Sequence, residues 1–209
     1  MKKIFLITEI FIIFIFVSLK SPAFCYYDFL PSHIHPVLIY SEIEKHLRDK
    51  WSAYAVPAKD TREVLKENSY AVWFTQELGE AWYQNKNQQN LWSRRERWRA
   101  RGKLNDGLND KLQFQFYLKA NTEELKLNEE ELYGIKVYLG DDRGNVFEPV
   151  KLEKGPLDEL VHNDFYQFTA YFNDRNPETL EKIVDNETKF MKIAINIRGS
   201  KYFFKWDLK

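Results

Sequence analysis

The C-terminal segment, residues 189–208, carries the pattern that most limits how this chain can fold. Apolar and polar residues alternate on both sides of Gly199-Ser200, and Gly-Ser between two such runs is typical of a two-residue β-hairpin turn. With that turn, Arg198 faces Lys201, Lys192 faces Asp207, and the opposite face of the hairpin is entirely apolar. The apolar pairs are predicted to be Ile197 with Tyr202, Ile195 with Phe204, Ile193 with Trp206, and Met191 with Leu208. Because a slip of one residue would turn these side chains to solvent, the pattern predicts a hairpin with one buried face.

Alternation with a period of two recurs in the preceding part of the chain. The segments that show it are 112–118, 133–139, 146–152 and 165–172. Short strands at this spacing, joined by Gly- and Asn-rich turns, predict an antiparallel β-sandwich over 111–209, Ig-like and with about seven strands.

The turn at 140–145 leaves two strand registers open. A two-residue loop would set Lys136 against Lys151, whereas a four-residue loop would pair Leu139 with Val146. Pro149 indicates an edge strand with either loop.

Residues 41–110 are predicted to be mainly helical, which makes the fold class α+β. Ser41 and Glu44 have the spacing of a capping box. The apolar stripe of the helix that follows, which is predicted to end before Pro57, consists of Ile43, Leu47, Trp51 and Tyr54. This helical region either packs on a sheet or forms a separate stalk.

Two further elements are predicted within the helical region. Residues 70–74 are rich in strand formers and are predicted to be the first strand of the sheet. Residues 76–101 show helical periodicity and are predicted to form one helix, or two with a break at 85–90. Gly102 is predicted to cap the end of this helical segment, and 104–110 to form a turn.

The N-terminus has the layout of a secretory signal peptide over 1–25, with Lys2-Lys3 before a short apolar run. Cleavage is expected before Tyr26, which would leave the protein in the periplasm or cell envelope of a bacterium. Lipid attachment at Cys25 and retention of the uncleaved segment are the alternatives. Residues 26–40 are predicted to form a tether.

Composition excludes some function classes. Basic and acidic residues number 31 each, so the chain has no overall field that would attract nucleic acid. The single cysteine, Cys25, lies in the predicted signal peptide, so no disulfide and no thiolate metal site is expected in the processed protein. The sequence also contains none of the nucleophile-elbow, Walker or metalloprotease motifs, and we expect no enzymatic activity.

The most strongly charged run lies at 94–103, where basic residues surround Trp98 and follow Trp92. Such a run can bind phosphate or sulfate groups by ion pairing and cation–π contact. The candidate residues for an anionic glycan or lipid are Trp92, Arg94, Arg95, Arg97, Trp98, Arg99 and Arg101. The alternative is a solvated basic face near the C-terminus of a helix, where cations interact favourably with the helix dipole.

Two other groups of residues resemble metal sites but are explained by local structure. His33 and His35 could hold a metal on an extended chain, yet Asp28 is the only nearby carboxylate and a solvated tether explains them better. Residues 105–110 resemble fragments of a calcium loop without its terminal glutamate, and turn formation explains their composition. We therefore predict no metal and no cofactor.

Residues of the predicted sandwich also carry a family resemblance. The residues concerned are Tyr133, Tyr138, Leu139, Asp142, Gly144, Pro149, Tyr166, Phe172, Gly199 and Trp206. Over Leu112 to Leu208 the chain resembles a group of uncharacterised exported bacterial proteins, many of them lipoproteins. The group has no agreed activity or site, so the resemblance implies export and no particular chemistry. Phe24 departs from the lipidation signal of many members.

Three functions follow as hypotheses. The first is a non-catalytic cell-envelope protein that binds a protein partner through its sandwich. The second is a module that binds an anionic glycan or lipid through residues 91–103. The third is a hydrolase that uses a pair of carboxylates.

Overall fold

The structure is a computed structural model that describes residues 36–59, 61–120, 134–154 and 165–209. Within the described residues the fold is α+β, with three helices and two antiparallel sheets of five strands each. Val37–Lys209 form one compact unit. The predicted signal peptide and most of the predicted tether lie outside the described residues.

The two sheets are named here by strand order. Sheet A contains, from edge to edge, β1 (Ser52–Tyr54), β3 (Tyr70–Trp73), β4 (Lys111–Leu118), β8 (Tyr166–Asn173) and β7 (Lys151–Lys154). Sheet B contains β2 (Val56–Pro57), β10 (Ser200–Asp207), β9 (Phe190–Ile197), β5 (Lys136–Asp141) and β6 (Val146–Phe147). The strand predicted at 70–74 is therefore β3.

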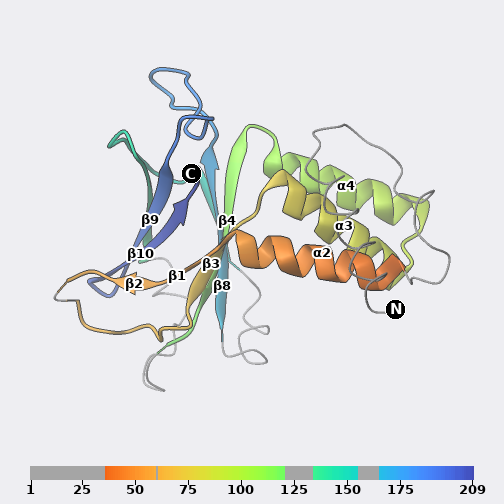
Figure 1. Cartoon of the computed structure of the whole chain (residues 1–209), viewed down its shortest axis with the longest axis horizontal. Coiled ribbons are helices and arrows are strands. Elements are labelled where there is room, and N and C mark those ends of the chain that lie inside the picture. The colour runs from red at the N-terminus through yellow and green to blue at the C-terminus, as the bar shows by residue number, and fades with distance from the viewer. Residues whose placement is uncertain (1–35, 60, 121–133, 155–164) are drawn as a thin grey trace, which may run out of the picture. The chain divides into compact units, whose positions relative to one another are not determined.

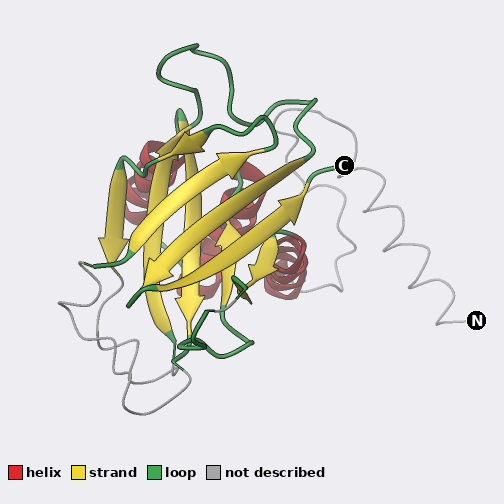
Figure 2. Cartoon of the chain, turned by 90° about the vertical axis from the view of Figure 1, so that its left-hand side faces the viewer, coloured by secondary structure: helices red, strands yellow, loops and turns green. Residues whose placement is uncertain are grey.

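The inner faces of the two sheets form the main core. Phe116 on β4 stacks on Phe168 of β8 at a ring-centroid distance of 4.5 Å, and it meets Phe204 of β10 edge-on at 5.4 Å. These aromatic side chains lie on alternate positions of their strands, so the period-two pattern correctly identified the buried faces. Figure 2 shows sheet B in front of sheet A, with the helices behind both.

The helices α2 (Pro36–Lys50), α3 (Gln76–Asn90) and α4 (Arg94–Leu108) lie on the outer side of sheet A. Figures 1 and 2 show that they extend away from the sheet instead of lying flat on it. A second core holds them there, with buried Leu47, Val72, Phe74, Leu78 and Ala81. Of the two arrangements open from the sequence, the helices thus pack on a sheet.

A polar network joins the same layers. Glu44 on α2 accepts hydrogen bonds from Arg48 at 3.0 Å and from the buried Asn85 of α3 at 2.7 Å. The Arg48 guanidinium also donates to the Tyr117 hydroxyl of β4 at 3.2 Å. These partners, together with the negative charge of Glu44, raise the pKa of Arg48 despite its burial. The network therefore fixes α2 against both α3 and sheet A.

The predicted boundaries of the first helix are wrong at both ends. α2 begins at Pro36, so the last residues of the predicted tether are helical, and Ser41 lies inside the helix instead of capping it. The helix ends at Lys50, and the backbone carbonyl of Trp51 accepts hydrogen bonds from the Trp73 amide at 2.9 Å and the Trp206 indole at 2.7 Å. Pairing with distant strands overrides the helical periodicity at this point.

The C-terminal hairpin has the predicted buried face but a different register. Its turn residues are Arg198 and Gly199, with φ of 51° and 79°, and Ile197 pairs with Ser200. Two consecutive left-handed residues define a type I′ turn, in which glycine suits the second position. The pairing is shifted by two residues from the prediction, so Trp206 faces Met191 instead of Ile193. A shift of two preserves the face that each side chain occupies.

The turn after β5 follows neither of the two registers left open by the sequence. Leu139 pairs with Phe147, and Gly144 adopts a φ of 89°. The Asp141 carboxylate accepts hydrogen bonds from the amides of Arg143 at 3.0 Å and Asn145 at 2.9 Å, which stabilises a three-residue loop. Pro149 then lies between β6 and β7, which are edge strands of different sheets, as expected for proline.

Candidate anionic-ligand surface

The basic run identified in the sequence forms the first two-thirds of α4. Ser93 caps this helix: its hydroxyl accepts a hydrogen bond from the Glu96 amide, and the Glu96 carboxylate accepts one from the Ser93 amide at 2.8 Å. This reciprocal pair is a true capping box. The hydrogen bonds from Ser93 lower the pKa of the Glu96 carboxyl. The cap therefore sets the start of the helix directly before the first arginine.

Two of the seven candidate residues are used in packing between α3 and α4. The Trp92 ring meets Trp82 edge-on at 6.4 Å and lies 5.9 Å from Tyr83. The Arg101 guanidinium forms an ion pair with Glu80 and lies 4.8 Å from the centroid of the Tyr83 ring. These contacts hold the two helices together, so Trp92 and Arg101 are explained as structural residues.

The other five candidates are exposed: Arg94, Arg95, Arg97, Trp98 and Arg99. Trp98 has 78% of its surface accessible, and no residue of α4 is buried. Positions three and four apart are neighbours on a helix, so Arg94 and Arg95 flank Trp98 on the same side. We refer to Arg94, Arg95, Trp98 and Arg99 as the α4 basic face.

The position of these arginines on the helix corrects the sequence interpretation. The predicted C-cap at Gly102 does not exist, because α4 continues to Leu108 through the predicted turn. Arg94 and Arg95 therefore occupy the first turn, where the positive end of the helix dipole disfavours cations by about 0.3–1 kcal/mol each. Among the described residues, no salt bridge joins either arginine to a carboxylate. A favourable interaction with the helix dipole therefore does not explain Arg94 and Arg95, as the alternative of a solvated basic face required.

A shallow pocket of about 260 Å³ lies between α3 and α4. It is lined by Gln76, Glu80, Arg101, Leu104, Asn105, Leu108 and Asn109. Since Glu80 neutralises Arg101, the pocket presents no uncompensated charge to an anion. It separates the α4 basic face from sheet A and adds no binding chemistry of its own.

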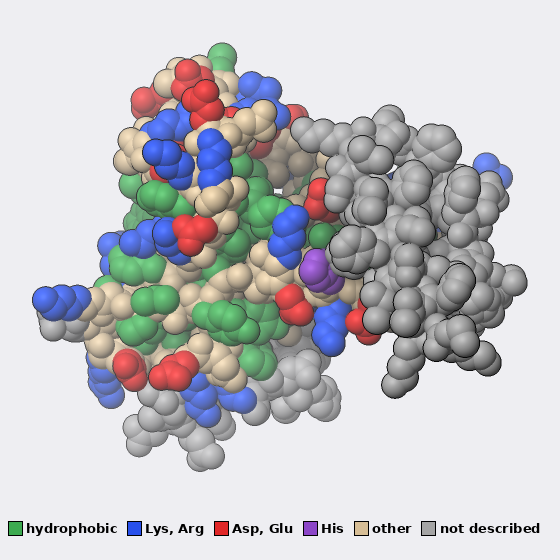
Figure 3. Space-filling view, viewed as in Figure 1, with side chains coloured by type: hydrophobic (Ala, Val, Ile, Leu, Met, Phe, Trp, Pro, Cys, Tyr) green, Lys and Arg blue, Asp and Glu red, His purple; other side chains and the backbone are tan. Residues whose placement is uncertain are grey.

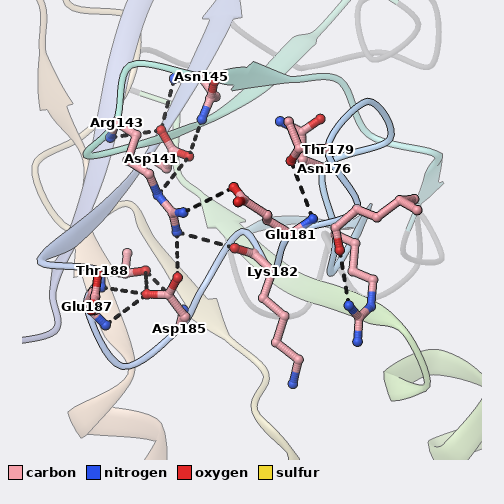
Figure 4. A network of polar contacts seen from close by, with 12 residues as sticks. Asp141, Arg143, Asn145, Asn176, Thr179, Glu181, Lys182, Asp185, Glu187 and Thr188 are labelled. Carbon is pink, nitrogen blue, oxygen red and sulfur yellow. Dashed lines mark hydrogen bonds and ion pairs between the residues drawn. The ribbon is translucent and has the colours of Figure 1, made fainter.

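Acidic residues gather instead around Arg143, in the loops that follow β5 and precede β9 (Figure 4). The Arg143 guanidinium lies 2.8 Å from Asp185, 3.9 Å from Asp141 and 3.9 Å from Glu181. Hydrogen bonds from the Glu187 amide and the Thr188 hydroxyl lower the pKa of Asp185 to about 2. The ion pairs with Arg143 therefore join the two loops, and the lowered pKa of Asp185 is opposite to the shift that a general acid of a hydrolase needs.

The remaining candidates give no site. His33, His35 and Cys25 lie outside the described residues. Within the parts of the chain that the structure describes, no three metal-ligating side chains come together. None of the helices in those parts combines the length and the apolarity that crossing a membrane requires.

Sequence reasoning missed a second group of basic residues, on the outer face of sheet B. Lys192 on β9 and Lys205 on β10 lie directly opposite each other, and Lys136 and Lys201 lie on the same face. The signal available in the sequence was the alternation of these lysines with apolar residues along the strands. The pattern was interpreted only as the solvent side of each strand.

Comparisons with known proteins add no function. No protein-family model and no curated protein matches this chain. One solved structure with similarity is a novel protein of unknown function from Burkholderia pseudomallei K96243, with 6% sequence identity and a TM-score of 0.43. The similarity covers 81% of this chain and 86% of that one.

Proposed function

We propose that this protein is a non-catalytic, exported cell-envelope protein whose α4 basic face binds the headgroups of anionic phospholipids. The observation that carries the proposal is the placement of Arg94 and Arg95 in the first turn of α4, next to the exposed Trp98. These arginines weaken the helix through its dipole and form no described salt bridge. Their charge is therefore better explained by a ligand than by stability.

The chemistry of the face suits a membrane surface. A guanidinium group binds a phosphate through two parallel hydrogen bonds, and tryptophan is favoured at the depth of lipid headgroups. Leu91, in the connection between α3 and α4, is 86% exposed and adds an apolar side chain directly before α4. Figure 1 shows that this connection lies at the end of the helices farthest from the sheets. The end of the helices that carries the α3–α4 connection can therefore contact a flat membrane surface.

The direction of α2 agrees with this orientation. In Figure 1, α2 begins at the same far end of the helical layer and runs toward sheet A. Lipid attachment at Cys25, or retention of the segment before it, would tether the chain shortly before α2 begins. Either alternative would add a membrane anchor to the chain, whereas cleavage before Tyr26, which we expect, would leave membrane binding to the α4 basic face.

The double variant Arg94→Gln/Arg95→Gln is expected to weaken binding to phosphatidylglycerol-containing vesicles. Each basic residue near an anionic surface contributes about 1 kcal/mol, so the loss should be about 2 kcal/mol, or roughly thirtyfold in affinity. Vesicle co-sedimentation of the purified protein at two salt concentrations measures it. Trp98→Ala should weaken binding at both concentrations, because its contribution is not a charge interaction.

A matched control removes two positive charges elsewhere. Lys66→Gln/Lys182→Gln alters two exposed lysines outside the helices and should bind vesicles like the unaltered protein. Equal binding to vesicles of phosphatidylcholine alone would contradict the proposal. Stronger binding to a soluble acidic polysaccharide than to vesicles, if Arg94→Gln/Arg95→Gln abolishes it, would also contradict the proposal. The same arginines would then bind a glycan.

Export is a separate part of the proposal and has its own test. We expect the natural protein to begin near Tyr26, because a short apolar run and Ala23-x-Cys25 precede that residue. N-terminal sequencing of the protein from its native cells measures this. A lipid-modified Cys25 would show membrane attachment instead, and an intact Met1 would contradict cleavage.

A protein partner bound by the sandwich is the second candidate function. Tyr54 and Val56, on or next to the edge strands β1 and β2, are 64% and 59% exposed. In the view of Figure 3, hydrophobic side chains are visible over the sheets among charged ones. We further propose that the two packed sheets form an Ig-like sandwich, which serves as a rigid scaffold for that partner. Two packed antiparallel sheets support that comparison, while β1–β3 add strands beyond the expected seven.

A further inference from the structure

We infer that the outer face of sheet B binds a linear acidic polysaccharide. This face is the side of β2, β10, β9, β5 and β6 that points away from sheet A. Figure 2 views it directly and shows no helix over it. The inference is independent of the α4 basic face, which lies on the other side of sheet A.

An apolar row crosses the middle of this face. The strand register places Tyr138 of β5 opposite Ala194 of β9, Ala194 opposite Phe203 of β10, and Phe203 opposite Val56 of β2. Ala194 carries only a methyl group, so the two aromatic rings stand on either side of a low point in the row. Neighbouring strands lie about 4.8 Å apart, so the row spans roughly 14 Å across the sheet.

Lysines flank the apolar row on both sides. Lys136 and Lys201 lie opposite Asn196 on one side, and Lys192 and Lys205 form a direct cross-strand pair on the other. Each lies two residues along its strand from the row, a separation of about 6–7 Å. The result is an apolar band with ammonium groups along both edges.

Positive charge is concentrated on this face. The Lys192 ammonium lies 3.6 Å and the Lys201 ammonium 5.2 Å from the centroid of the Phe203 ring, so both converge on one side chain. Asp207 compensates only Lys205, at 2.6 Å. The Lys205 ammonium also lies 5.1 Å from the centroid of the Phe190 ring. Like charges directly opposite each other on an antiparallel pair repel, and the contacts with Phe203, Phe190 and Asp207 offset part of that repulsion. An anionic ligand between the lysines would remove that repulsion.

An acidic polysaccharide matches both properties of the band. The ring of each sugar has an apolar face that can pack on Tyr138, and its ionised groups project from the edges of the chain toward the lysines, two of which are held over the Phe203 ring. A bilayer matches less well, because the two aromatic side chains are partly buried while three of the four lysines around them are exposed. The outer face of sheet B therefore suits a polysaccharide that lies on its surface better than a bilayer that its side chains would have to penetrate.

Together with the proposed lipid surface, this assignment gives the protein two anionic ligands on opposite sides. The helices extend from sheet A in one direction and the outer face of sheet B points in the other (Figure 1). A molecule attached to a bilayer through α4 would present its lysine-flanked band to polysaccharide away from that bilayer.

The test is binding of the full chain to polygalacturonate, a carboxylated polysaccharide, with dextran as the neutral control. Lys192→Gln/Lys205→Gln should weaken binding by at least about tenfold, since two charge contacts are lost. The same change removes a like-charge pair together with the Lys205–Asp207 ion pair and the Lys192–Phe203 contact, so thermal stability should change little. Tyr138→Ala should also weaken binding, with a smaller dependence on salt.

The controls separate this inference from the proposed function. Lys66→Gln/Lys182→Gln and Arg94→Gln/Arg95→Gln should both retain binding to polygalacturonate, and Lys192→Gln/Lys205→Gln should retain binding to vesicles. Equal binding by all variants, or loss only in the α4 variant, would overturn the assignment to sheet B. If the unaltered chain does not bind polygalacturonate, the assignment is overturned as well. Binding to polyglutamate in its place would show that the ligand is an acidic polypeptide.

Discussion

Replacement of Trp206 by alanine is expected to lower the free energy of unfolding by about 3–5 kcal/mol, the usual loss for a large aromatic side chain in a core. Trp206 is 3% exposed, and its ring lies 5.2 Å from that of Phe114 on the other sheet. Its indole N–H also donates to the Trp51 carbonyl at 2.7 Å. Since small domains are stable by only about 5–15 kcal/mol, the variant should be close to unfolding.

Phe203→Ala is the matched control for this experiment. Phe203 lies on the same strand but on the outer, half-exposed face, so its truncation creates no internal cavity and should cost clearly less. Urea unfolding of both variants, followed by tryptophan fluorescence and circular dichroism, gives the comparison. Equal losses would show that both faces of sheet B are buried, and a larger loss for Phe203→Ala would show that the faces of β10 are reversed.

The second large effect is expected for Tyr202→Phe, which removes one oxygen atom. The buried Tyr202 hydroxyl accepts hydrogen bonds from the amides of Val64 at 2.6 Å and Leu65 at 3.0 Å. Without it, two buried N–H groups lose their acceptor, and each such loss costs about 1–3 kcal/mol. The substitution should therefore destabilise the protein by several times the effect of a typical surface change.

Tyr138→Phe provides the control, because the Tyr138 ring lies on the outer face of sheet B and is only half-buried. Urea midpoints of the two variants should differ clearly, with Tyr202→Phe the lower. Hydrogen exchange of the Val64 and Leu65 amides gives a second measurement, since both should exchange faster in Tyr202→Phe. Unchanged exchange at these amides would show that the hydroxyl is not their acceptor.

The sandwich could be predicted because its signal is local. Alternation of apolar residues along β4, β8, β9 and β10 reports which side of each strand is buried, whatever its neighbours are. Pairing registers could not be predicted in the same way, because they depend on turn conformation. In the C-terminal hairpin, the left-handed backbone of Arg198 moved the turn by one residue.

Elements that depend on distant partners were also missed. Trp51 and Tyr54 follow a helical period in the sequence, but β1 is drawn into sheet A by pairing with β3. The α4 basic face could be identified from composition, whereas its position at the start of the helix depends on the Ser93 cap. The lysines of sheet B come from β5, β9 and β10, so only the assembled sheet brings them together.

The pairing of β2 with β10 determines when the chain can finish folding. Val56 pairs with Phe203, and the Trp206 indole bonds to a carbonyl 155 residues earlier in the sequence. The core between the two sheets therefore cannot close until the residues through Trp206 have been synthesised. Contacts of such long range also slow folding, because a large loop must be ordered before they form. For a chain that we propose to be exported, this delay would keep the polypeptide unfolded long enough to be threaded through a translocation channel.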